Sequence, residues 1–162
     1  VQAFGILVER YERVLYNLGL RMLGNPEDAR DASQTAFLKA WDKLSSYDPR
    51  FRFFSWIYRI TVNECLNQIQ SRRRVEPLDP EIDLPSGEDA ASGLRAREAS
   101  ERVQAALLQL TPEHREVVIL RHFLEMSYGE IAGTLTIPEK TVKSRLYEAR
   151  QRLCALLPAS AA

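Results

Sequence analysis

The chain has 162 residues, and its 22 lysine and arginine side chains are balanced by 22 aspartate and glutamate side chains. A zero net charge by itself argues against a nucleic-acid-binding protein, because proteins that bind phosphates usually carry a basic excess. No apolar run reaches the roughly 20 residues that span a bilayer, and no signal-peptide pattern is present, so we expect a cytoplasmic protein. Two distant cysteines, Cys65 and Cys154, and two histidines form no metal-ligand or catalytic pattern, so we expect free thiols, no cofactor and no enzyme.

The charges are unevenly distributed along the chain. Residues 50–75 carry a net charge of +5, residues 76–89 carry −6 and residues 139–162 carry +3. The acidic stretch also contains prolines, which fix φ and remove a backbone donor, so we expect an irregular acidic linker there. The chain then divides into an N-terminal domain (1–75), a linker (76–95) and a C-terminal domain (96–158).

The N-terminal domain is predicted to be helical. A second helix begins at Asn25-Pro26, where asparagine caps the first turn and proline suits the first helical position. Apolar residues then recur at three- and four-residue steps as far as Leu44. A third helix is predicted from about Phe53 to Arg73. The helix that precedes both carries Val14, Leu15, Leu18 and Met22.

The start of the third helix combines aromatic and basic residues. Six of the fourteen aromatic residues lie between Tyr47 and Tyr58, accompanied by Arg50, Arg52 and Arg59. Stacking rings in a cationic groove are typical of proteins that hold single-stranded nucleic acid, and a neighbouring pocket can take a base turned out of the duplex. Core packing of helix-spaced rings is the alternative interpretation.

The C-terminal domain is predicted to contain a helix-turn-helix. Thr111-Pro112 begins one helix, and Ser127 with Glu130 fits a capping box that begins the next. A break follows, and Thr136-x-x-Glu139 is expected to cap the last helix. An exposed stripe on that helix is typical of a helix that enters the DNA major groove, whereas an ordinary helical hairpin is the alternative. The stripe comprises Lys140, Lys143, Ser144, Tyr147 and Gln151, opposite the apolar Val142, Leu146, Ala149 and Leu153.

Three stretches in this order resemble the extracytoplasmic-function (ECF) group of bacterial RNA polymerase sigma factors. The opening of sigma region 2 is similar to NLGLRMLGNPEDARDASQTAFLKAWDKL, and its promoter-melting part is similar to FRFFSWIYRITVNECLNQIQSRRR. Region 4 is similar to LTPEHREVVILRHFLEMSYGEIAGTLTIPEKTVKSRLYEARQRL. The resemblance implies an all-α fold of two small helical domains, and a non-catalytic subunit that directs core RNA polymerase to promoter DNA.

The resemblance also assigns residues to partners. Contacts with the β′ coiled coil of core RNA polymerase are implied for Asp31, Gln34, Phe37, Leu38 and Trp41. Contacts with the minus-ten promoter element are implied for Arg50, Arg52, Trp56, Arg59 and Asn63, with the loop 45–52 holding a flipped base. Contacts with the minus-thirty-five element are implied for Lys140, Lys143, Ser144, Arg145, Tyr147 and Arg150. Region 4 is also implied to dock on the β flap, and the linker either threads toward the RNA exit channel or is a solvated tether.

A further partner implied by the resemblance is an anti-sigma factor, which commonly clamps both domains and can hold the chain at the inner membrane. No small-molecule substrate is expected. A helix-turn-helix regulator with a ligand-sensing N-terminal domain is the alternative, and the arginine and aromatic cluster argues against it. The chain departs from the family pattern at Thr35, Thr136 and Glu148, so we expect altered polymerase contact and a different promoter sequence.

Overall fold

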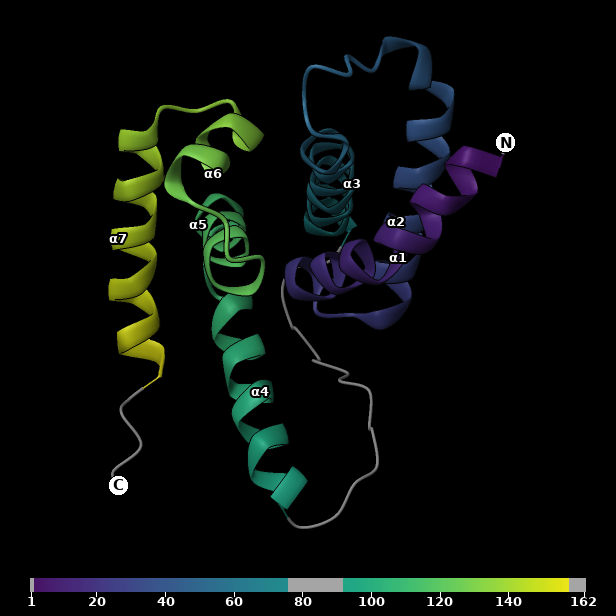
Figure 1. Ribbon diagram of the computed structural model, residues 1–162. Helices are drawn as coiled ribbons and strands as arrows, with labels where there is room; N and C mark the ends of the chain where they lie inside the picture. The colour runs from purple at the N-terminus through teal and green to yellow at the C-terminus, as the bar shows by residue number, and fades with distance from the viewer. Residues whose placement is uncertain (1, 76–91, 158–162) are drawn as a thin grey trace.

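The computed structural model describes residues 2–75 and 92–157, and within these ranges it contains helices and no strand. The expected all-α fold is therefore confirmed. Two groups of helices lie beside each other, and we refer to α1–α3 as the N-terminal module and to α4–α7 as the C-terminal module (Figure 1). Residues 76–91 of the predicted linker lie outside the described residues. The remainder of that linker was wrongly predicted as irregular, because α4 already begins at Ser92.

Three helices form the N-terminal module, and they follow the predicted pattern. The Asn25 side chain accepts hydrogen bonds from the backbone N–H groups of Glu27 and Asp28, and Pro26 stands in the first turn, which confirms the predicted cap. The chain reverses before this cap at Gly24, whose φ is 75°. The elements are α1 (Gln2–Leu23), α2 (Pro26–Asp42), the short 3-10 turn η1 (Leu44–Ser46) and α3 (Phe53–Val75).

The C-terminal module contains the predicted helix-turn-helix and one helix that sequence reasoning did not identify. Thr111 caps the helix after it, and Ser127 and Glu130 form the predicted capping box. The unidentified helix is α4, which supplies one wall of the module. The elements are α4 (Ser92–Leu108), α5 (Pro112–Val118), the π-helical turn η2 (Ile119–Phe123), α6 (Tyr128–Leu135) and α7 (Glu139–Leu156).

The turn between α6 and α7 differs from its prediction. Thr136 ends α6 in the left-handed conformation, with φ 57° and ψ 46°, and Pro138 precedes α7 without a side-chain hydrogen bond. The predicted Thr136-x-x-Glu139 capping box is therefore wrong, because the threonine is already committed to the end of the previous helix. A β-branched residue in this conformation is uncommon, and glycine adopts it without steric cost.

The two modules pack directly against each other along a seam. The Gln104 side chain on α4 donates to the Leu20 carbonyl near the end of α1, at 3.1 Å. On the other side of the seam, the hydroxyls of Ser55 on α3 and Thr134 on α6 are 3.0 Å apart. One cluster of buried apolar side chains extends through both modules. The seam therefore holds the modules in a closed arrangement.

Two further observations concern residues singled out in the sequence. Cys65 is buried and Cys154 is exposed, and both are free thiols, as expected. Burial raises the pKa of the Cys65 thiol to about 12. In the described part of the chain, none of the helices combines the length and the apolar character needed to cross a bilayer.

Candidate polymerase and nucleic-acid interfaces

The exposed face of α2 carries an apolar patch. Leu38 is 68% exposed and Trp41 is 45% exposed, although both are large apolar side chains on a well-formed helix. Asp31 and Gln34 are also exposed and precede them along the helix. An apolar centre with polar neighbours is the usual composition of a protein–protein contact. The structure thus places four of the five predicted polymerase-binding residues at the surface.

Phe37 is the exception among the five residues. Its side chain is only 8% exposed, and its ring packs edge-on against Phe4 of α1, with the centroids 6.5 Å apart. Phe4 also contacts Trp41, at 5.0 Å. Phe37 therefore belongs to the α1–α2 core and supports the patch from beneath, and its predicted contact with the polymerase stays a prediction.

The aromatic cluster before and within α3 divides into packed rings and one free ring. Tyr47, Phe53 and Trp56 contact one another, with centroids 5.1–5.6 Å apart. The Tyr47 hydroxyl donates to the Phe51 carbonyl at 2.6 Å, which braces the loop. The Phe51 side chain itself remains 66% exposed. Core packing thus explains the half-buried Trp56, whereas Phe51 is left available for stacking.

The arginines around this loop have different partners. Arg50 forms a two-pronged pair with Asp48, with nitrogen–oxygen distances of 3.0 Å and 2.6 Å. These hydrogen bonds lower the pKa of the Asp48 carboxyl and raise that of Arg50. Arg59 and Asn63 are exposed one turn apart on α3. Four of the five predicted minus-ten residues are therefore accessible, and Trp56 is partly covered.

Arg52 has a partner from the other module. Its Nη1 lies 2.8 Å from Oε1 of Glu130, which stands at the start of α6. Hydrogen bonds from the Ser127 backbone and side chain lower the pKa of Glu130, with Arg52 adding to the effect. A groove of about 950 Å³ runs between the loop and α6, with Arg10 and Phe51 in its lining. Sequence reasoning assigned Glu130 only to a cap, because no local signal indicates a contact across 78 residues.

The exposed stripe on α7 matches the predicted reading face. The side chains of Lys140, Ser144 and Arg150 are exposed, and Tyr147 is 65% exposed. Lys143 is also exposed, and its Nζ contacts Oε1 of Glu139 at 2.8 Å. That contact raises the pKa of the Lys143 ammonium, which would be protonated at neutral pH even without it. The structure thus brings five of the six predicted minus-thirty-five residues to the surface of one helix.

Arg145, the sixth predicted minus-thirty-five residue, lies off this stripe. Its side chain is 27% exposed, and its Nη1 lies 3.3 Å from Oε1 of the buried Glu116 on α5. Burial raises the pKa of the Glu116 carboxyl from its ordinary 4.5 to about 7, against the opposing effect of Arg145. Arg145 therefore joins α7 to α5, which positions the exposed stripe.

Glu116 should make the stability of the chain depend on pH. The folded chain holds a proton on Glu116 that the unfolded chain releases, so the free energy of unfolding falls as pH rises from about 4.5 to about 7. Urea unfolding should show a loss of roughly 1–3 kcal/mol across this window. Glu116→Gln should flatten the profile, whereas Glu125→Gln, at an exposed position, should leave it unchanged. Parallel profiles for the natural chain and Glu116→Gln would contradict this expectation.

Sequence reasoning missed a buried arginine that holds the seam. Arg115 is 6% exposed, and its guanidinium donates to the carbonyls of Leu107 and Leu108 at 2.8 Å each, and to that of Leu110 at 3.0 Å. It also donates to the Met22 carbonyl at the end of α1. Helix ends leave carbonyls without intrahelical partners, and a cation there is favourable. Arg115 thus completes the ends of two helices from different modules.

Comparison with known proteins gives consistent matches in both modules. Residues 7–75 match Sigma-70 region 2, and residues 100–153 match Sigma-70, region 4. The chain is 33% identical to ECF RNA polymerase sigma factor SigW of Bacillus subtilis, over 93% of this chain and 87% of that protein. The structure of CnrH in complex with the cytosolic domain of CnrY is 30% identical, with a TM-score of 0.75 over 98% of this chain and 90% of that one. The fold is also that of the sigma factor RpoE in complex with the anti-sigma factor NepR from Bartonella quintana, with 23% identity, a TM-score of 0.80 and 99% coverage of both chains.

Proposed function

The chain belongs to the extracytoplasmic-function RNA polymerase sigma factors, and from this premise we propose how its modules divide promoter-specific transcription initiation. The N-terminal module docks on core RNA polymerase and opens the minus-ten element, and the C-terminal module reads the minus-thirty-five element. The observation that carries this division is the presence of three exposed surfaces on three separate elements. These are the α2 patch, the Phe51 loop with the start of α3, and the α7 stripe.

Polymerase docking is assigned to the α2 patch. Leu38 and Trp41 supply the apolar centre, and Asp31 and Gln34 supply its polar border. Large side chains at the centre of a contact contribute most of its free energy, while the border excludes water. The β′ coiled coil is the partner that the sigma region 2 match supports for this face.

Minus-ten opening is assigned to the loop before α3. The exposed Phe51 ring can stack on a base turned out of the duplex, and base–aromatic stacking contributes roughly 1–3 kcal/mol. The packed Tyr47 and Trp56 rings fix the position of the loop. Arg59 and Asn63 lie exposed further along α3, where they would contact the phosphates and edges of the separated strand.

Minus-thirty-five reading is assigned to α7 as the second helix of the helix-turn-helix. Lys143, Ser144 and Tyr147 would enter the major groove, with Lys140 and Arg150 near phosphates. Arg145 acts through Glu116 as a positioning residue. Initiation at a promoter would therefore require both modules, because each reads a different element.

Run-off transcription tests the proposed function as a whole. Core RNA polymerase is supplied with genomic DNA fragments from the source bacterium, with and without the purified chain. The chain should produce new transcripts whose start points share two upstream elements. Transcripts identical in number and position in both reactions would overturn the proposal.

Lys143→Ala tests the reading helix. Loss of a cation at the groove should weaken use of a promoter carrying the minus-thirty-five element by about 1–3 kcal/mol, or roughly 5- to 150-fold. Lys43→Ala, an exposed lysine beyond α2, is the matched control and should have no effect. Equal transcript yields from the two variants would remove α7 from the reading role.

Anti-sigma control is the last part of the proposal. The CnrH and RpoE structures that this chain resembles hold CnrY and NepR respectively. We infer an anti-sigma factor that binds across both modules and keeps the chain in the cytoplasm away from polymerase. The assignment of residues 1–75 to one domain remains a prediction within this scheme, and the C-terminal module includes α4 from Ser92, before the predicted limit at residue 96.

A further inference from the structure

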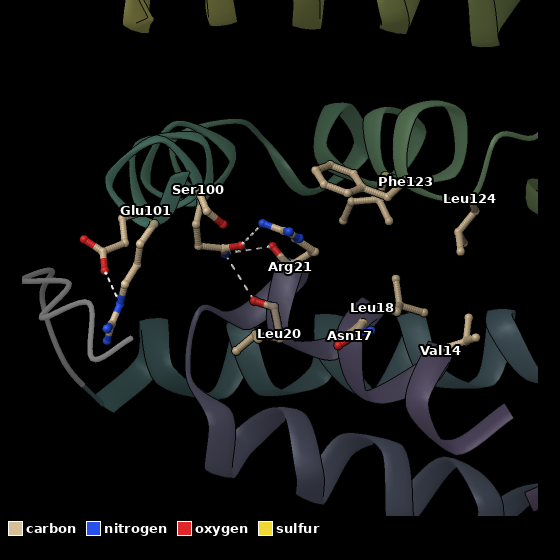
Figure 2. Close-up of a pocket in the computed structure, with 12 residues that line it drawn as sticks. Val14, Asn17, Leu18, Leu20, Arg21, Ser100, Glu101, Phe123 and Leu124 are labelled. Atoms are coloured by element: carbon tan, nitrogen blue, oxygen red, sulfur yellow. Dashed lines mark hydrogen bonds and ion pairs between the residues drawn. The ribbon is translucent and has the colours of Figure 1, made fainter. Parts of the chain in front are cut away.

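The seam between the modules contains a cavity that the proposed function does not use. It has a volume of about 460 Å³ and lies between α1 on one side and α4 with η2 on the other (Figure 2). Cavities of this size are typical of small-molecule sites, which occur preferentially where domains meet. One wall comes from each module, so an occupant would touch both at once.

A half-buried cation lies in this cavity. The Arg21 guanidinium donates to Oε1 of Gln104 at 3.2 Å and lies 4.3 Å from the centroid of the Phe123 ring (Figure 2). Among residues 2–75 and 92–157, no carboxylate lies within ion-pair distance of it, although a guanidinium offers five N–H donors. Burial lowers the pKa of Arg21, which reflects the cost of holding its charge away from water. A carboxylate is the group that a guanidinium binds in two-pronged geometry.

The rest of the lining is divided into an apolar and a polar part. Val14, Leu18 and Leu124 lie together on one side of Arg21, next to Phe123 (Figure 2). Ser100 and Asn17 add neutral polar groups, and Gln104 is only 2% exposed. The carboxylate of Glu101, which also lines the cavity, lies 3.7 Å from Arg97, so its charge is balanced on α4. Arg97 also lines the cavity and pairs with Glu101, so Arg21 is the lining cation that has no carboxylate within ion-pair distance in the described residues.

We propose that this cavity binds a small amphipathic carboxylate, whose anionic group pairs with Arg21 and whose apolar body lies against Leu18, Phe123 and Leu124. The ligand would bridge α1 to α4 and η2, and would therefore stabilise the closed arrangement of the modules. In that arrangement Glu130 forms an ion pair with Arg52, which lies in the loop before α3, and the Ser55 hydroxyl contacts the Thr134 hydroxyl. Occupation would thus restrain the part of the chain assigned to minus-ten opening.

Binding is tested on the full chain with 3-phenylpropionate, and 3-phenylpropanol serves as the uncharged counterpart. Amide resonances of residues on both walls, including Leu18 and Ser100, should shift saturably with the carboxylate and hardly with the alcohol. Arg21→Met should weaken carboxylate binding at least about tenfold. Ser100→Phe should block the cavity while Arg21 remains. Arg13→Met, an exposed arginine on the same helix, is the control and should bind as the natural chain does.

Closure is tested by disulfide formation between cysteines introduced at Ser55 and Thr134, whose Oγ atoms are 3.0 Å apart. The exposed Cys154 is first replaced by serine, and the buried Cys65 can stay because its raised pKa keeps it as the thiol. The carboxylate should speed disulfide formation at least about twofold, and Ser100→Phe should abolish that gain. Unsaturable binding, equal affinity for the alcohol, or an unchanged rate at saturating carboxylate would each overturn the proposal.

The effect of the ligand on transcription can be measured only if the chain is a sigma factor, so this test rests on the proposed function. The carboxylate should lower run-off transcript from the natural chain and leave transcript from Ser100→Phe unchanged. A chain that gives no transcript even without ligand would refute the proposed function, while the binding and closure results would still decide this inference. Full transcript from a saturated natural chain would show that the cavity does not govern promoter opening.

Discussion

Arg115→Ala should lower the free energy of unfolding of the chain by about 3–5 kcal/mol, because it removes a buried guanidinium that bonds to several carbonyls. The loss has two parts: the end of α4 loses its partners, and the Met22 carbonyl of α1 loses its contact with the other module. Urea unfolding followed by far-ultraviolet circular dichroism measures the effect.

Two further variants sharpen this expectation. Arg115→Lys should recover only a small part of the loss, since one ammonium cannot reach carbonyls on both modules in the way a planar fork does. Arg102→Ala is the control, because Arg102 is exposed on α4 and its pair with Glu98 is 3.7 Å long. Exposed pairs of this kind contribute about 0–1 kcal/mol. A loss below about 1 kcal/mol for Arg115→Ala would show that water replaces the guanidinium without cost.

Leu38→Arg should weaken binding of the chain to core RNA polymerase by about 3 kcal/mol, or roughly a hundred-fold. The substitution places a charge at the centre of the α2 patch, where docking would strip it of water. Leu38 is 68% exposed, so the folded chain itself should be unaffected. Fluorescence anisotropy of the labelled chain titrated with core polymerase measures the affinity.

Phe51→Arg is the matched control for this variant. Phe51 is 66% exposed, so the two substitutions change side chains of similar size and exposure on different surfaces. Phe51→Arg should bind polymerase normally and lose minus-ten opening. If both variants lost polymerase affinity equally, docking would not be confined to α2.

Features that depend on neighbouring residues could be predicted from the sequence. The caps at Asn25, Thr111 and Ser127 are local, since each side chain satisfies a backbone donor two or three residues away. The apolar face and the exposed stripe of α7 follow from helical periodicity alone. Local patterns therefore predicted the fold class and the α7 stripe, whereas the residues assigned to the polymerase on α2 came from the family resemblance.

Features that depend on distant residues were missed or misassigned. Phe37 and Arg145 were assigned to partners through the family resemblance, but Phe4 and Glu116 give them internal contacts. Thr136 was assigned to the wrong helix, because a capping pattern does not reveal which backbone conformation the threonine adopts. Helix α4 went unidentified because its first turn follows directly from a stretch rich in proline and glycine.

Gln104 and Arg115 donate hydrogen bonds to the end of α1, and both are translated long after that helix. The Leu20 carbonyl accepts from a side chain 84 residues later, and the Met22 carbonyl from one 93 residues later. Domains generally form in order as they leave the ribosome, so α1–α3 assemble before either donor exists. Until then, water must solvate the Met22 carbonyl, whereas the Leu20 carbonyl already accepts from the Gly24 N–H at 2.9 Å. The end of α1 in the nascent chain thus gains its last hydrogen-bond donor only after Arg115 has left the ribosome.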